Sequence, residues 1–448
     1  MRVTLAILAL TAIAFPATAQ VREVRLDEAV QMGIDHAPDL RLGGRDAEKA
    51  HAESWSALGA MGPRLSTDGG VQYWDKATSV DIAGSFLSIL PAGMMTTLGI
   101  DPSKIPPMRV QDRLTWAVNL QAVQPLTPLY PLYYLWRVNR LNEDAANITQ
   151  EGNRDAVRYR VSEAFFRVLA AQRMIEVARK AVEQVEAHLK TARSFEAAGV
   201  VGRDDVLRAE AALARAQDGL NQATYGTALA RAVLNVTIGL PQQTETQPVG
   251  DYPENPPAFA PTEAQVADKA LAARSEVRST EKRVLMAEAG RQAAIGAMIP
   301  TVAGVFRYGH TEGSQFQRKD AYFVGASFSW NFWEWGSSYF KVKSVEADRA
   351  KAEDARQAVH DGVVLDVAKA FMDLRNARSS IDMNRKAIEA SDEALRVVTK
   401  KFEASTATTT DVLDAQGALT QARAAYQVAV FNYYTAVANL RRAAGTDL

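Results

Sequence analysis

Four segments of the chain alternate apolar and polar side chains with the period of two that β-strands show. They are residues 64–74, 114–122, 301–308 and 322–331. In the last of them, Tyr322, Val324 and Phe328 fall on one face, and the opposite face has Ser327 and Ser329. Each segment is about ten residues long, which is enough for a tilted strand to cross a bilayer. The pattern predicts four strands with one apolar face each.

The C-terminal segment instead repeats apolar side chains every seven residues. The repeating positions are Val412, Leu419, Tyr426, Tyr433 and Leu440, with Ala415, Ala422, Ala429 and Ala436 three positions after the first four. The same register recurs in the first half from Val206 to Leu234 and is interrupted only at Thr227. This pattern is typical of a coiled-coil seam, and its alanines predict closely packed helices.

The helical segments have two lengths. The long ones are residues 132–200 and 337–404, and the shorter ones are residues 26–62, 204–240, 262–299 and 411–444. At ~1.5 Å per residue a long segment spans roughly 100 Å, and two stacked short segments match it. A bundle core is the alternative interpretation, but a compact domain rarely needs helices of this length.

The chain is a tandem duplication. Gly59 to Pro63 returns as Gly296 to Pro300, and the Asp-Val-Leu sequence that begins at Asp205 returns at Asp411. We therefore predict a first repeat over residues 20–240, a polar and proline-rich linker over 241–261 that wraps the outside, and a second repeat over 262–448.

Residues 1–19 have the features of a secretory signal peptide. Arg2 precedes an apolar run of about a dozen residues, and the small-residue site Ala17-Thr18-Ala19 follows Pro16. The sequence therefore predicts export. The apolar run is too short to span a bilayer as a helix.

Composition narrows the function classes. The chain has 51 basic and 52 acidic residues, which offers no basic field for nucleic acid. It has no cysteine, which excludes disulfides, thiol chemistry and thiolate metal sites. Its five histidines are scattered without a second ligand at metal spacing, so we expect neither an enzyme nor a metal or other cofactor.

The strands and the export signal together favour a membrane barrel. A soluble sandwich would explain one such strand, but there are four of them. Trp330, Trp333 and Trp335 also cluster at one strand end and resemble an interfacial aromatic girdle. Four strands cannot close a barrel, and an open sheet edge in lipid leaves backbone groups unsatisfied. We therefore expect oligomerisation.

In this order of features the chain resembles the TolC family of outer-membrane efflux and secretion channels. The resemblance rests on the opening Leu26-Asp27-Glu28-Ala29-Val30, the following Pro38-Asp39-Leu40, the helix-to-strand junctions at Pro63 and Pro300, and the paired Asp-Val-Leu tips. It implies a mainly α chain with a membrane β-barrel portion. In the family, three chains form a 12-stranded barrel, with four strands per chain, that continues into a trimeric α-helical tunnel in the periplasm.

The resemblance also implies a function. Such a channel is passive and exports substrates across the outer membrane, as part of a tripartite efflux pump or a type I secretion system. Its partners are two further copies of the chain, outer-membrane lipid, a periplasmic adaptor and an inner-membrane pump. The alternative is a periplasmic adaptor-like coiled-coil binding protein, but adaptors lack four strands of membrane length.

The predicted site residues lie at the helical tips. They are Asp204 and Asp205 in the first repeat and Asp411 and Asp414 in the second. Each is explained by a helix N-cap or first-turn charge, but threefold symmetry would turn an inward-facing aspartate into a ring of carboxylates that attracts cations. The resemblance matches Asp411 and Asp414 to the family's acidic constriction.

The family's closed state also uses a tyrosine and an arginine as a latch. The matching positions here are Phe402 and Ala407, which lack those polar groups, and Arg203 or Arg208 is a possible substitute. A long first hairpin around residues 78–109, rich in glycine and proline, predicts an outer loop that folds partly on itself. We expect it to pack over the barrel mouth as a lid, and a ligand or receptor role is the alternative.

Overall fold

The computed structural model describes residues 22–81, the single positions 94, 97, 99 and 101, and residues 104–250, 252–256 and 259–445. The predicted signal peptide and most of the predicted loop at 78–109 lie outside these residues. The chain forms two compact units, each built from segments of both repeats. Unit 1 combines Met1–Asp46, Asn147–Ser279 and Gln357–Leu448, and unit 2 combines Ala47–Ala146 and Thr280–Arg356.

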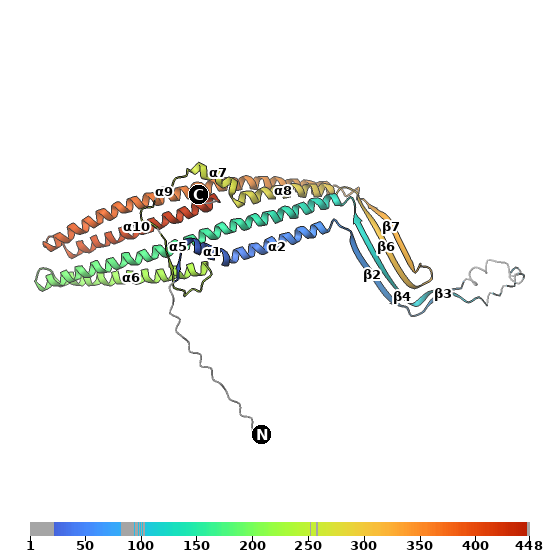
Figure 1. Ribbon diagram of the computed structural model, residues 1–448, viewed down its shortest axis with the longest axis horizontal. Coiled ribbons are helices and arrows are strands. Elements are labelled where there is room, and N and C mark those ends of the chain that lie inside the picture. The colour runs from blue at the N-terminus through green and yellow to red at the C-terminus, as the bar shows by residue number, and fades with distance from the viewer. Residues whose placement is uncertain are drawn as a thin grey trace, which may run out of the picture. The chain divides into compact units, whose positions relative to one another are not determined.

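Long helices dominate the described residues (Figure 1). They are α1 (Leu26–His36), α2 (Pro38–Gly59), α5 (Leu129–Ala197), α6 (Arg203–Thr237), α7 (Glu263–Ala273), α8 (Ser275–Gly296), α9 (Ser337–Glu403) and α10 (Thr409–Ala444). The two predicted long segments are confirmed as α5 and α9, with 69 and 67 residues. Within the described residues, no helix combines the length and the apolar composition that a membrane span requires.

Two predicted helical segments are each divided by one extended residue, which corrects the prediction of continuous helices over 26–62 and 262–299. In the first repeat the dividing residue is Ala37, with ψ 119°, because the ring of Pro38 disfavours a helical conformation in the residue before it. In the second repeat it is Arg274, with ψ 133°, and no proline follows. Both repeats thus have an 11-residue helix followed by a 22-residue helix.

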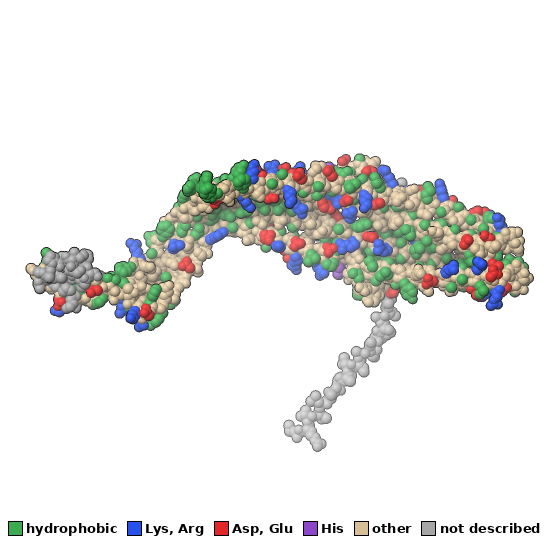
Figure 2. Space-filling view, turned by 180° about the vertical axis from the view of Figure 1, so that it is seen from behind, with side chains coloured by type: hydrophobic (Ala, Val, Ile, Leu, Met, Phe, Trp, Pro, Cys, Tyr) green, Lys and Arg blue, Asp and Glu red, His purple; other side chains and the backbone are tan. Residues whose placement is uncertain are grey.

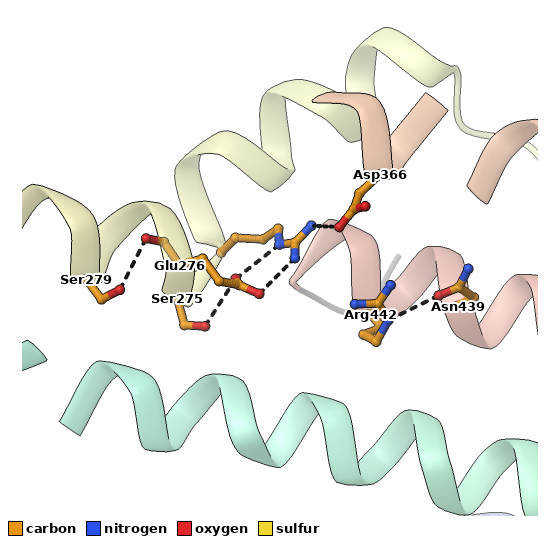
Figure 3. Close-up of polar contacts among 7 residues, drawn as sticks. Ser275, Glu276, Ser279, Asp366, Asn439 and Arg442 are labelled. Carbon is orange, nitrogen blue, oxygen red and sulfur yellow. Dashed lines mark hydrogen bonds and ion pairs between the residues drawn. The ribbon is translucent and has the colours of Figure 1, made fainter. Parts of the chain in front are cut away.

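The second break has no proline and is held instead by ion pairs of the Arg274 side chain. Its guanidinium is 7% exposed and donates to Glu276 at 2.8 Å and to Asp366 of α9 at 3.0 Å. Figure 3 shows these two carboxylates converging on the break. The ion pairs fix α7 and α8 to α9 without requiring a particular backbone residue.

The core of unit 1 follows the predicted heptad seam. All five apolar repeat positions of α10 are buried, as are Ala422, Ala429 and Ala436. In α6 the two ends of the seam are buried, including Thr227, whose hydroxyl donates to the carbonyl of Ala223 at 2.9 Å. The coiled-coil prediction is therefore confirmed, with a partly exposed middle in α6.

The segment between the repeats contains a short strand. Its strand β5 (Thr246–Pro248) pairs in parallel with β1 (Arg22–Val24), which the sequence did not predict. Buried Asn235 of α6 holds this segment, since its side chain donates to the carbonyls of Gln242 and Thr244. Tyr252 then packs between Phe166 of the first repeat and Tyr434 of the second, with ring centroids 5.2 and 5.3 Å away.

Unit 2 contains the predicted strands. They are β2 (Arg64–Tyr73), β4 (Met108–Pro125), β6 (Thr301–Ser314) and β7 (Asp320–Ser329), with the short β3 (Thr78–Val80) beside β4. The order is β2-β4-β6-β7, and all neighbours are antiparallel. Two hairpins, one from each repeat, therefore join side by side through β4 and β6 (Figure 1).

Candidate membrane-facing sheet and helical tips

The register of the sheet aligns apolar side chains in rows across all four strands. One row joins Leu65 to Ala122, Ala122 to Phe306, and Phe306 to Val324. Paired residues of adjacent strands point to the same face, so the alternation of each strand adds to one apolar face. We call it the apolar face. Its larger side chains are Leu65, Val71, Tyr73, Leu114, Trp116, Val118, Leu120, Phe306, Tyr308, Tyr322, Val324 and Phe328.

This face is open. Leu65, Tyr322 and Val324 have exposed fractions of 75%, 80% and 72%, and no helix covers them in the described part of the chain. Contiguous apolar surface of this kind is rare on a protein in water, where it marks a surface that binds protein or membrane. The arrangement can bury its side chains in lipid.

The opposite face is polar. The amide of Asn119 donates to Asp68 at 2.8 Å, and Arg307 donates to Gln121 at 2.9 Å, so cross-strand pairs there are hydrogen-bonded. Gly309 pairs with Asn119, and Ala321 pairs with Gly309, while one aromatic residue of this face, Phe323, pairs with Arg307. This face can line water.

Polar groups interrupt the apolar face near the β6–β7 turn. His310 and Tyr308 both bond to Asp320, at 2.8 and 2.7 Å, and Lys319 donates to Glu312 at 2.8 Å. At the other end, exposed aromatic side chains follow β7, as the sequence predicted for an interfacial girdle. The apolar stretch of β6 and β7 is thus bounded at both ends.

The sheet has two open edges. Within the described residues β2 pairs only with β4, and β7 pairs only with β6. The outer edges of β2 and β7 therefore present backbone N–H and C=O groups that need a partner if the apolar face lies in lipid.

The helical tips of unit 1 contain matching turns. Residues 198–202 join α5 to α6, and residues 404–408 join α9 to α10. The second residue after each long helix has a left-handed backbone, at Gly199 (φ 74°) and Ser405 (φ 57°). The duplication therefore preserves the turn geometry, although only one of the two residues is glycine.

Phe402, predicted as a latch position, is buried between the tips of the long helices. Its ring stacks on Phe195 of α5 at 5.5 Å and 17°. His188 packs on the same ring at 5.0 Å. Phe402 is 2% exposed and joins α5 to α9 by packing, whereas Ala407 lies half-buried in the turn before α10.

The predicted aspartates have different surroundings. Asp411 forms a capping box with Thr408, whose backbone N–H and hydroxyl both donate to its carboxylate at 2.8 Å. These two hydrogen bonds lower the pKa of Asp411, so the group is ionised at neutral pH. Asp414 is exposed one turn later, and Asp204 lies 3.9 Å from Arg208 of its own helix.

Sequence reasoning missed a group of buried polar atoms between α5 and α10. The Nε2 of His188 and the side-chain oxygens of Gln184, Thr409 and Gln416 are buried without a protein partner. The amide of Gln416 donates to the backbone carbonyl of Gln184 at 3.2 Å. Burial also lowers the pKa of His188, and the charge of Asp205 opposes this effect. The available signal was Gln416, a polar residue next to the seam position Ala415 of α10.

No group of three or more metal-ligating side chains occurs in the part of the chain that the structure describes. The helical tips thus contain packed aromatic side chains and carboxylates, and the sheet has one apolar and one polar face.

Comparison with known proteins agrees with this geometry. Residues 114–240 and 266–446 match the model of the outer membrane efflux protein family. The outer membrane efflux protein BepC of Brucella suis is 24% identical over 266 residues, which cover 58% of this chain and 57% of BepC. The outer membrane protein TolC of Escherichia coli is 28% identical over 123 residues, 28% of this chain and 25% of TolC.

The fold is similar to that of the outer membrane channel CmeC of Campylobacter jejuni, with a TM-score of 0.77 and 14% identity over 94% of this chain and 85% of CmeC. The chain spans 57% of the length of BepC, little more than half of that relative. Since the family model covers more than half of this chain, the resemblance predicted from the sequence is confirmed, and the protein belongs to the outer membrane efflux protein family.

Proposed function

We propose that this chain is one protomer of a trimeric outer-membrane channel that exports substrates from the periplasm to the outside. The observation that carries the proposal is the apolar face, which continues in register across four strands and is backed by a polar face. Three such sheets joined through the edges of β2 and β7 give a closed 12-stranded barrel with an apolar outside and a polar lumen.

The helices extend this proposal. In a trimer, the long helices α5 and α9 with their shorter partners would form a tunnel in the periplasm. The buried alanine seam of α10 supports close helix packing of that kind. We further propose that the channel is passive and works with a periplasmic adaptor and an inner-membrane pump, in a tripartite efflux pump or a type I secretion system.

Two arginine substitutions on one strand test the membrane-facing assignment. Val324→Arg places a charge on the apolar face, and Ser327→Arg places the same charge on the polar face three residues away. An arginine facing lipid costs about 2–4 kcal/mol at the bilayer midplane, whereas a lumen-facing one is solvated.

The measurement is the amount of folded protein extracted from outer membranes, followed by conductance in planar bilayers. We expect Val324→Arg to lower the folded amount strongly and Ser327→Arg to leave it unchanged while altering conductance. Equal tolerance of both variants would contradict the proposed orientation, and a wild-type protein that forms no conductance would contradict the channel itself.

A further inference from the structure

The connection between β7 and α9 differs from its counterpart in the first repeat. Residues 330–336 separate β7 from α9, whereas only residues 126–128 separate β4 from α5. The longer connection contains Trp330, Phe332, Trp333 and Trp335, and the shorter one has no aromatic residue. Unit 2 therefore has an aromatic loop that the duplication does not require. We call residues 330–336 the aromatic loop.

One residue of this loop has an unfavourable backbone conformation. Trp335 has φ 52°, a left-handed conformation that bulky residues rarely adopt, and Gly336 follows with φ 81°. The turn brings Trp333 and Trp335 together, edge to face, with ring centroids 5.7 Å apart. A glycine at position 335 would adopt this conformation without strain, whereas the Trp335 side chain there is 87% exposed.

The aromatic loop and the start of α9 line a pocket of about 330 Å³. Its lining includes the aromatic residues Trp330, Phe332, Trp333 and Tyr339 and the carboxylate residue Glu334, together with residues 297–299 and 301 from the junction of α8 and β6. The three rings from the loop are more than half exposed. Figure 2 shows hydrophobic side chains gathered where the sheet meets the helices. The pocket is thus aromatic, open and equipped with one carboxylate.

Glu334 has hydrogen-bond partners but no cation. Its two carboxylate oxygens accept from the Asn331 amide and the Ser338 hydroxyl. No Lys, Arg or His among the described residues lies within 4.0 Å of it. These hydrogen bonds, that from Ser338 first, lower the pKa of Glu334 and keep it ionised. One bond to each oxygen supports the start of α9 and leaves lone pairs available.

Aromatic side chains and a carboxylate that line one pocket can together bind an organic ammonium ion, because the cation is attracted by a ring face and by the carboxylate. The pocket begins directly after β7, whose last apolar side chain, Phe328, is 68% exposed on the apolar face. If the apolar face lies in lipid, as the proposed function states, the pocket lies at the level of lipid headgroups.

We infer that this pocket binds the ammonium headgroup of a membrane lipid, with Glu334 and the rings of Trp330, Phe332 and Trp333 as its ligands. The inference rests on the proposed function for the position of the pocket. It names a lipid class and a site that the membrane-facing assignment alone does not require.

The test uses the full-length protein extracted in mild detergent and mixed with equal amounts of phosphatidylethanolamine and phosphatidylglycerol of the same acyl chains. Lipid retained after chromatography is quantified by mass spectrometry. We expect wild-type protein to retain phosphatidylethanolamine about fivefold over phosphatidylglycerol. Glu334→Gln keeps the shape of the side chain and one oxygen that can accept from Asn331, while its NH2 can donate to the Ser338 hydroxyl, and we expect it to reduce this ratio to about one.

One control variant outside the pocket and a second variant within it separate the site from general effects. Asp348→Asn removes an exposed carboxylate of α9 away from the pocket and should leave the ratio unchanged. Trp333→Leu keeps an apolar side chain but removes a ring face, and should lower the ratio as Glu334→Gln does. Equal retention of both lipids by wild type, or an unchanged ratio in Glu334→Gln, would overturn the inference.

Displacement of the bound lipid by soluble ethanolamine at millimolar concentration would assign the pocket to free amines and overturn the lipid assignment. Failure of the proposed function has a different signature. The protein would then stay in solution without detergent and retain neither lipid.

Discussion

Ser405 has a left-handed backbone conformation, as does Gly199, its counterpart in the first repeat. A side chain in this conformation is strained, since its Cβ crowds the following carbonyl oxygen. We expect Ser405→Gly to stabilise the protein by about 1 kcal/mol and Gly199→Ser to destabilise it by a similar amount. Chemical unfolding in detergent measures both. A destabilising Ser405→Gly would show that the serine side chain contributes more than its strain costs.

His188 makes the packing of the tips depend on pH. Its pKa is lowered in the folded protein by burial, so the unfolded chain binds a proton at a higher pH than the folded chain does. The packing is therefore fully stable above the ordinary histidine pKa of about 6.5 and weakens as the pH falls below it. Asp205 opposes this effect, but burial is the larger cause.

We expect hydrogen exchange, corrected for intrinsic rates, to be faster around Phe195 and Phe402 at pH 5.5 than at pH 7.5. His188→Phe keeps an aromatic ring beside Phe402 and removes the titrating group, so the difference should disappear in that variant. A pH response that persists in His188→Phe would assign the titration to another group.

Asp411 and Asp414 remain the predicted selectivity residues of the tip. Neutralising both to asparagine removes charge while it keeps the side-chain size, so cation preference in single-channel recordings should fall. Asp411 is ionised but occupied by its capping box, whereas Asp414 is exposed. We therefore expect Asp414→Asn alone to account for most of the loss. Unchanged selectivity in the double variant would leave the two residues as helix-capping and surface charges.

At the scale of the helix, the alanine seam of α10 is the feature to test. Replacing Ala422 or Ala429 with leucine inserts volume into a buried contact, and we expect a destabilisation of roughly 1–3 kcal/mol per protomer. Ala418 is exposed on the same helix, and Ala418→Leu should change stability by less than about 0.5 kcal/mol. Equal thermal stability of all three variants would place the seam elsewhere.

Local periodicity predicted most elements correctly because each strand and helix has one buried or apolar side. The four strands appear where alternation places them, and α10 buries the heptad positions read from Val412 to Leu440. The break at Ala37 had a local signal in Pro38 that the periodic pattern obscured. The break at Arg274 had none, because contacts with Glu276 and Asp366, the latter distant in the chain, hold it.

The candidate sites were less predictable because they also depend on contacts between segments that are distant in the chain. The stack of Phe195 on Phe402 depends on how two tips meet, and the polar group at His188 depends on which helix covers it. Neither can be read from the pattern of a single helix. The pairing of β1 with β5 likewise joins two three-residue segments, which are too short to show a period.

At the scale of the whole molecule, the sheet is the feature that leads to the proposed trimer. If its apolar face lies in lipid, as the proposed function states, the open edges of β2 and β7 need strand partners. Copies joined edge to edge form a closed barrel, in which the backbone groups of every strand pair with a neighbouring strand. Twelve strands from three chains make such a barrel in the proposed function.

The mass of the mature protein in detergent tests this account most directly. Light scattering corrected for bound detergent should give three times the protomer mass, and the protein should precipitate when the detergent is removed. A monomer or a stable dimer, or a protein that stays dispersed without detergent, would contradict the account.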